Sequence, residues 1–183
     1  GGGRCARTGG WGRAAGEGRG WGRGVGWEAG DTVWGWPDRS RSMAFACRQA
    51  RDSKIGRALI VTFALAELLV AGGERVGVPG LMNPTASRNV IDKMAQAILH
   101  DGLTRTSLPP SFVPSARSEV VVLSDFWSPI AEIRTMLAGL STSGAHGTLL
   151  QVVDPAEETF PYSGRVEFVE PEDGSVITAG RAE

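Results

Sequence analysis

The fold is decided by the stretch Asp31-Thr-Val-Trp-Gly-Trp-Pro-Asp38-Arg-Ser40-Arg-Ser42-Met43. Its first part, Thr32 to Trp36, is mostly β-branched or aromatic, which is typical of a short buried strand, and Pro37 stops that strand. An acid and two hydroxyls then follow at alternate positions, Asp38, Ser40 and Ser42. They predict a group of hard oxygen ligands above the carboxyl edge of a sheet, which suits Mg²⁺ and leaves room for a partner's carboxylate.

The rest of the chain alternates helix and strand patterns. Ser53 is the expected N-cap of a helix over 54–71 that ends at Gly72-Gly73. A second helix is expected after Ser87, up to Gly102, and a third from Ser128-Pro129 onward. The other expected elements are strands at 75–81, 119–124 and 148–153, a turn at 83–86, a loop at 103–118 and a hairpin of 165–169 with 175–179. This order predicts an α/β fold with a doubly wound, mostly parallel sheet and a C-terminal β-hairpin.

A second acid follows the strand expected at 119–124. That strand is a continuous apolar run, as in parallel sheets buried on both faces, and Asp125 comes directly after it. Ligands of such sheets bind outside the carboxyl ends of the strands, so Asp38 and Asp125 share one crevice if their strands are neighbours. The plainer alternative is that Asp38, Ser40 and Asp125 only cap turns. Arg39 and Arg41 are expected to project into solvent.

Three segments closely resemble the bacterial DUF58 family, of the alphaproteobacterial type. They are Asp-Arg-Ser-Arg-Ser-Met-Ala-Phe at 38–45, Ala-Leu-Ala-Glu-Leu-Leu-Val-Ala-Gly-Gly-Glu-Arg-Val-Gly at 64–77, and Val-Val-Leu-Ser-Asp-Phe-Trp-Ser-Pro at 121–129. The resemblance covers roughly residues 31–183 and implies a von Willebrand factor A-like domain with a metal-ion-dependent adhesion site.

In a site of that type, the two serines ligate the ion directly and the acids act largely through water. A threonine from another loop adds a third hydroxyl, and Thr85 is the candidate here. Its surroundings, Asn-Pro-Thr-Ala-Ser, depart from the usual Gly-x-Thr. The metal ligand set implied by the resemblance is therefore Asp38, Ser40, Ser42, Thr85 and Asp125, with Mg²⁺ as the ion.

The function that the resemblance implies is a binding or adaptor module with no catalysis of its own. Its expected partner is a protein, a MoxR-type AAA+ ATPase, which would supply the nucleotide chemistry. A metal-dependent hydrolase using the same crevice is one alternative, and a non-functional gene fragment is another. Several enzyme classes are excluded: position 40 is serine where an Asp-x-Asp phosphatase needs an acid, and neither Gly-x-Ser-x-Gly nor a phosphate-binding loop occurs.

Composition limits the partners and the cellular location that can be expected. The net charge of −1 over 183 residues provides no field that would attract nucleic acid or an anionic membrane. Cys5 and Cys47 form no Cys-x-x-Cys pair, which favours a reducing, cytoplasmic location. His100 and His146 belong to no zinc pattern. The longest apolar run, 58–71, is interrupted by a glutamate and is shorter than the ~20 residues of a membrane-spanning helix.

The two ends of the chain carry separate expectations. Residues 1–30 are mostly Gly, Arg and Trp, which predicts a disordered segment. A nucleic-acid-binding arm and translation in a wrong reading frame are the two alternatives for it. Residues 31–183 form the expected domain. DUF58 relatives continue with a further helix, so the domain is expected to be incomplete at its C-terminus, with a sheet face left uncovered and a tendency to associate.

Overall fold

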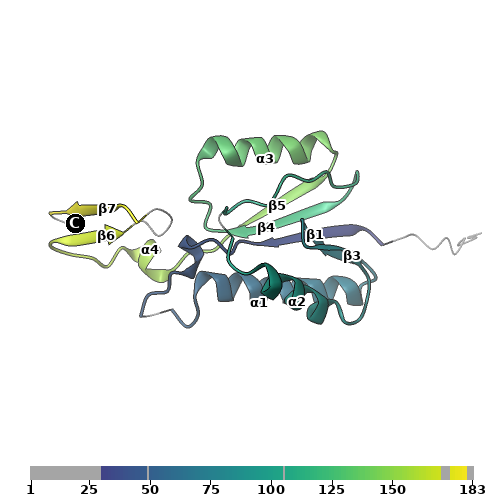
Figure 1. Ribbon diagram of the computed structural model, residues 1–183, viewed down its shortest axis with the longest axis horizontal. Helices are drawn as coiled ribbons and strands as arrows, with labels where there is room; N and C mark the ends of the chain where they lie inside the picture. Colours follow the sequence, from purple (N-terminus) through teal and green to yellow (C-terminus); the bar gives the residue numbers. More distant parts are fainter. Residues whose placement is uncertain (1–29, 49, 105, 170–173, 181–183) are drawn as a thin grey trace, which may run out of the picture.

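The computed structural model describes residues 30–48, 50–104, 106–169 and 174–180. At its centre is a five-stranded sheet in the order β3-β2-β1-β4-β5 (Figure 1). The central strand β1 (Thr32–Pro37) is parallel to β2 (Arg75–Val78) on one side and to β4 (Glu119–Ser124) on the other. β5 (His146–Gln151) continues the sheet parallel to β4, whereas β3 (Met82–Thr85) is an antiparallel edge. The predicted mixed α/β fold with a mostly parallel sheet is confirmed.

Helices cover both faces of this sheet. α1 (Lys54–Ala71) contacts β1, β2 and β4, while α3 (Ile130–Thr142) packs on β5 from the opposite face (Figure 1). α2 (Val90–Asp101) lies against α1 and the β2–β3 edge. The side chains of α2 that face inward are spaced by four residues, at positions 90, 94 and 98, as one face of a helix requires. The largest core cluster consists of Trp36, Ala66, Val76, Val78, Val90, Met94, Ile98, Val120, Val122 and Leu140.

The ends of the helices agree with the predicted caps at some positions and differ from them at others. The Ser53 side chain caps α1 by accepting a hydrogen bond from the Gly56 N–H, as predicted. Gly102 ends α2 with φ of 72°, which glycine adopts at little cost. The predicted caps at Ser87 and Ser128 are wrong, because α2 begins after Asn89 and α3 begins after Pro129, neither with a side-chain cap.

The turn predicted at 83–86 is also wrong. These residues mostly belong to β3, and the chain reverses earlier, at Gly80, whose φ is 73°. Pro84 lacks an N–H and therefore cannot sit in a central strand, but an edge strand tolerates it. The strand predicted at 75–81 correspondingly ends at Val78, and the strand predicted at 148–153 is shifted to 146–151.

A second group of elements lies beyond the carboxyl ends of β1 and β4. It consists of the 3₁₀ helix η1 (Ser42–Ala44), the short helix α4 (Pro155–Thr159) and the predicted hairpin, formed by β6 (Val166–Val169) and β7 (Val176–Ala179). All of them occupy one end of the molecule (Figure 1). The candidate site residues described below lie where this group meets the sheet.

Three further expectations concern the N-terminal segment, the uncovered part of the sheet and membrane-spanning helices. The segment 1–29, to which the disorder, nucleic-acid-arm and reading-frame hypotheses refer, lies outside the described residues. At the sheet's edge, all six residues of β5 are exposed. Within the described ranges, the helices are too short or too polar for any of them to span a membrane.

Candidate functional site

The register of the sheet brings the two predicted acids to the same edge. Pro37, the last residue of β1, pairs with Leu123 of the neighbouring strand β4. Directly after this pair, the Asp38 N–H donates to the Leu123 carbonyl oxygen at 2.8 Å. Ser124 then donates its hydroxyl proton to Asp38 Oδ2 at 2.7 Å, and Asp125 follows. The condition on which a shared crevice depends, that the strands be neighbours, is met.

Asp38 is the most enclosed carboxyl group at this edge. Its side chain is fully buried, and its Oδ1 accepts a hydrogen bond from the Ser40 N–H at 2.8 Å. Burial raises the pKa of Asp38 above its ordinary value, although the hydrogen bonds from Ser124 and Ser40 oppose this and the nearby Asp125 charge adds to it. Asp38 therefore caps the turn, as the plainer alternative predicts, and is also fixed at the centre of the oxygen cluster.

The two serines provide the best geometric match to a cation site. Ser40 is buried, Ser42 is the first residue of η1, and their Oγ atoms lie 3.1 Å apart. Neighbouring ligands of an octahedral Mg²⁺ ion with bonds of 2.0–2.1 Å are separated by ~3 Å. The Ser40 and Ser42 hydroxyls are hydrogen-bonded to each other, and this distance is also the spacing of two adjacent Mg²⁺ ligands.

Asp125 is engaged by a cation of the chain itself. The Lys54 Nζ lies 3.0 Å from Asp125 Oδ2 and 2.6 Å from Glu157 Oε1, while Asp125 Oδ1 accepts from the Trp127 N–H at 3.2 Å. In the part of the chain that the structure describes, no group of three or more acidic, histidine or cysteine side chains could hold a metal. The donors at this edge are mainly hydroxyls and do not form a carboxylate cage.

Thr85 is not brought to this edge. It pairs with Val76, which in turn pairs with Val33 near the start of β1, so it lies toward the amino ends of the parallel strands. Its Oγ1 accepts a hydrogen bond from the Ser87 N–H. Ser107, a hydroxyl-bearing residue from another loop, lines the same pocket as Ser42 and Asp125.

Arg39 does not project into solvent, contrary to the sequence-based expectation. Only 2 % of it is exposed, and its guanidinium lies 5.3 Å from the centre of the Trp36 ring. The guanidinium donates to the Ile98 and Gly102 carbonyl oxygens and pairs with Asp101 at 2.9 Å, so it ties the loop after β1 to the end of α2. Arg41 is exposed, as expected.

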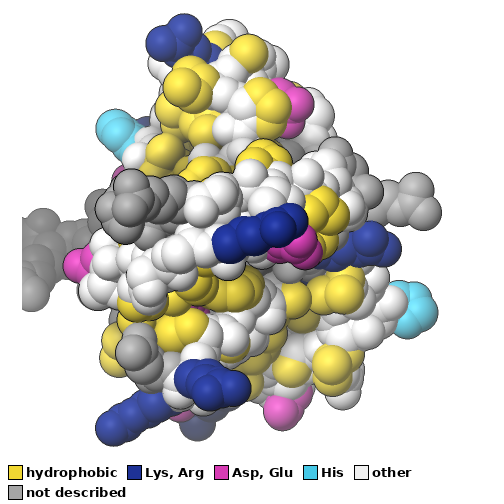
Figure 2. All heavy atoms as spheres, turned by 90° about the vertical axis from the view of Figure 1, so that its left-hand side faces the viewer, with side chains coloured by type: hydrophobic (Ala, Val, Ile, Leu, Met, Phe, Trp, Pro, Cys, Tyr) yellow, Lys and Arg dark blue, Asp and Glu magenta, His cyan; other side chains and the backbone are white. Residues whose placement is uncertain are grey.

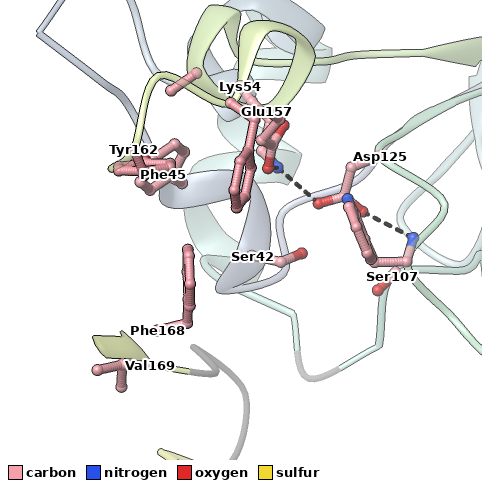
Figure 3. Close-up of a pocket in the computed structure, with 12 residues that line it drawn as sticks. Ser42, Phe45, Lys54, Ser107, Asp125, Glu157, Tyr162, Phe168 and Val169 are labelled. Carbon is pink, nitrogen blue, oxygen red and sulfur yellow. Dashed lines mark hydrogen bonds and ion pairs between the residues drawn. The ribbon is translucent and has the colours of Figure 1, made fainter. Parts of the chain in front are cut away.

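A pocket of about 450 Å³ opens beside Ser42 (Figure 3). Its floor is polar and its walls are aromatic, with residues from η1, α1, α4, β6 and the loops that follow η1, α2, β4 and α4. On the surface of this end of the molecule, hydrophobic side chains are exposed among a few charged ones (Figure 2). The polar lining residues are Ser42, Lys54, Ser107, Asp125 and Glu157, and the aromatic ones are Phe45, Trp127, Phe160, Tyr162 and Phe168.

Lys54 and Glu157 were not predicted as site residues, although a feature of the sequence points to each of them. Lys54 is the first residue of α1, where a cation is unfavourable next to the positive end of the helix dipole unless a carboxylate neutralises it. Glu157 belongs to the capping box Asp154-Pro-Ala-Glu157: its Oε2 accepts from the Asp154 N–H, and Asp154 accepts from the Ala156 N–H. That motif predicts the start of α4.

Comparison with known proteins identifies one family. The sequence model of the family described as "Protein of unknown function DUF58" matches residues 3–183. The match begins well before residue 31, so the resemblance extends further than the sequence patterns indicated and includes most of the Gly/Arg/Trp-rich segment. Searches of curated proteins and of solved structures find no match to this chain.

Proposed function

The chain belongs to the DUF58 family, and on that premise we propose that it is a binding or adaptor module whose carboxyl-edge site takes a Mg²⁺ ion. The observation that carries the proposal is the hydroxyl pair Ser40 and Ser42, 3.1 Å apart beside the buried Asp38 carboxyl. Mg²⁺ bound there would leave one coordination position open to a partner's carboxylate.

Each residue of the site has a distinct part in this proposal. Ser40 and Ser42 hold the ion directly through their hydroxyls. Asp38, fixed by the Ser124 hydroxyl and the Ser40 N–H, orients a water molecule and supplies negative charge. Asp125 also orients a water molecule and supplies negative charge, which it shares between Lys54 and the ion. Ser107, and not Thr85, would provide a third hydroxyl from the loop after α2.

The partner in this proposal is a protein that presents an acidic side chain to the open position. A MoxR-type AAA+ ATPase is the proposed partner, in the cytoplasm, and the chain itself would carry out no reaction. The arrangement supports binding because the pocket beside the site is large and rimmed by half-exposed aromatic rings, which are common anchors of protein interfaces.

A capture experiment tests this function. The chain is immobilised and a MoxR-type ATPase is passed over it with Mg²⁺, or with EDTA. We expect capture with Mg²⁺ only, and its loss in Ser40→Ala. Equal capture in EDTA contradicts the proposal, and Mg²⁺-dependent hydrolysis of p-nitrophenyl phosphate by the purified chain would favour the hydrolase alternative.

A further inference from the structure

The aromatic wall of the pocket is organised around Phe160. Its ring stacks on Phe168 with centroids 5.8 Å apart and planes at 19°, and the Tyr162 ring meets Phe160 edge-on at 5.3 Å. Phe160 nevertheless remains 50 % exposed, and its φ of 44° is a left-handed conformation that non-glycine residues rarely adopt. Phe160 is the C-cap of α4, and helices commonly end with a residue in this conformation. The ring is therefore held at the pocket instead of being buried in a core.

The polar floor carries more negative than positive charge. Lys54 contributes one positive charge, whereas Asp125 and Glu157 contribute two negative ones, and all three line the pocket. The Lys54 ammonium already contacts both carboxylates, so it is not available to an anionic ligand. Asp38 is a further acid nearby, since the Asp125 charge contributes to raising the pKa of Asp38. A positively charged ligand therefore complements this floor.

We propose that the pocket binds an arginine side chain of the protein partner. A guanidinium can stack on an aromatic face and at the same time donate two hydrogen bonds to a carboxylate, which a lysine ammonium does less well. Aromatic side chains and Glu157 line the same pocket, so a guanidinium entering it meets both kinds of group. Glu157 is the more exposed carboxylate of the pair, at 24 % of its side chain, and a guanidinium would share its Oε1 with Lys54 and its Oε2 with the Asp154 N–H. The pocket shares Ser42 and Asp125 with the cation site, so this inference rests on the proposed function only in placing the partner there.

The first test uses the whole chain in EDTA, so that its outcome is independent of the metal. N-acetylarginine amide, its neutral norleucine analogue and its acidic glutamate analogue are titrated separately. Binding is followed by NMR through the indole N–H signal of Trp127, which lines the pocket and is assigned by loss of the signal in Trp127→Phe. We expect saturable arginine binding that is about tenfold tighter than norleucine binding, equivalent to one favourable cation–aromatic and carboxylate contact.

Variants then locate the binding. Glu157→Gln should weaken arginine binding by about fivefold, whereas Glu158→Gln, on the exposed next residue of α4, should leave it unchanged. Phe160→Leu should weaken it while preserving the carboxylates. Equal affinity for norleucine, tighter binding of the glutamate analogue, or no binding at all would overturn the proposal, without bearing on whether the chain binds Mg²⁺.

Discussion

The Lys54 Nζ lies 3.0 Å from Asp125 Oδ2, and the two side chains are only 3 % and 1 % exposed. A cation supplied by the chain thus faces the acid that a Mg²⁺ site at this edge needs. Lys54 both neutralises a buried carboxylate and competes with a divalent ion for it. Lys54 is therefore expected to raise the stability of the fold and to lower its affinity for a divalent ion. One substitution at this position should change the two quantities in opposite directions.

Lys54→Met is expected to destabilise the chain and to tighten divalent-ion binding. Without the ammonium, Asp125 is a buried charge with no cationic partner, which costs about 3 kcal/mol of unfolding free energy in EDTA. The same loss removes the competing cation, so the affinity for Mn²⁺ should rise at least about fivefold. Urea unfolding and Mn²⁺ titration by electron paramagnetic resonance measure the two quantities.

Lys93→Met is the matched control for that variant. Lys93 is an exposed residue of α2, so its substitution should change neither the unfolding free energy nor the Mn²⁺ affinity measurably. A folded Lys54→Met protein with unchanged or weaker Mn²⁺ binding would show that the ammonium does not compete for the site.

Asp38→Asn is expected to stabilise the metal-free chain at neutral pH. Burial raises the pKa of Asp38, so the folded state favours the protonated form. The stabilising contribution of that form is complete below the unfolded-state pKa and is lost as the pH rises through the higher folded-state pKa. Asparagine stays neutral and should remove this decline. Unfolding curves in EDTA across the acidic range measure it, and a loss of stability at pH 7 would be the contrary result.

Arg39→Ala should destabilise the chain far more than Arg41→Ala, although the two residues are neighbours in the same motif. Arg39 is buried against Trp36 and joins the loop after β1 to the end of α2, so its removal should cost about 3 kcal/mol. Arg41 is exposed, and its removal should cost less than about 0.5 kcal/mol. Thermal unfolding followed by circular dichroism compares them, and equal melting temperatures would contradict the structural role of Arg39.

Asp154→Ala is expected to loosen the segment that closes the pocket. Burial alone would raise the pKa of Asp154, but hydrogen bonds from the Cys47 and Ala156 N–H groups and the Lys54 charge lower it overall. Its ionised form therefore stabilises the fold above the unfolded-state pKa, and this stabilisation is lost as the pH falls through the lower folded-state value. The substitution should cost about 1–2 kcal/mol at pH 7 and reduce the acid sensitivity of unfolding. An unaltered acid profile would argue against this role.

The sequence predicted the sheet well because its signals are local. The apolar run of β4 and the alternation of helices and strands follow from short stretches, and they place Asp38 and Asp125 after strands. β3 was not predicted because proline usually indicates a turn. Pro84 is compatible with a strand only at the edge of a sheet, and the sequence does not reveal that position. The shift of β5 to 146–151 has a similar cause, since an edge strand exposed at every position lacks a hydrophobic pattern.

The candidate site was predicted only in part, because pairing across the fold determines it. The alternate spacing of Asp38, Ser40 and Ser42 was visible in one segment, whereas Lys54 and Glu157 come from segments about a hundred residues apart. The type of residue alone makes Thr85 a candidate, and only the antiparallel direction of β3 shows that it lies toward the other end of the sheet. The burial of Arg39 depends on the position of α2, which no local pattern of charges reveals.

Mn²⁺ binding to the purified chain, compared with Ser40→Ala, tests the central claim most directly. Free Mn²⁺ is counted by electron paramagnetic resonance, with Ser115→Ala as a control hydroxyl that lies outside the site. We predict one saturable site in the wild-type and Ser115→Ala chains that Mg²⁺ displaces, and its loss in a folded Ser40→Ala chain. No saturable binding in the wild type, or equal binding in all three proteins, would contradict a cation site at this edge.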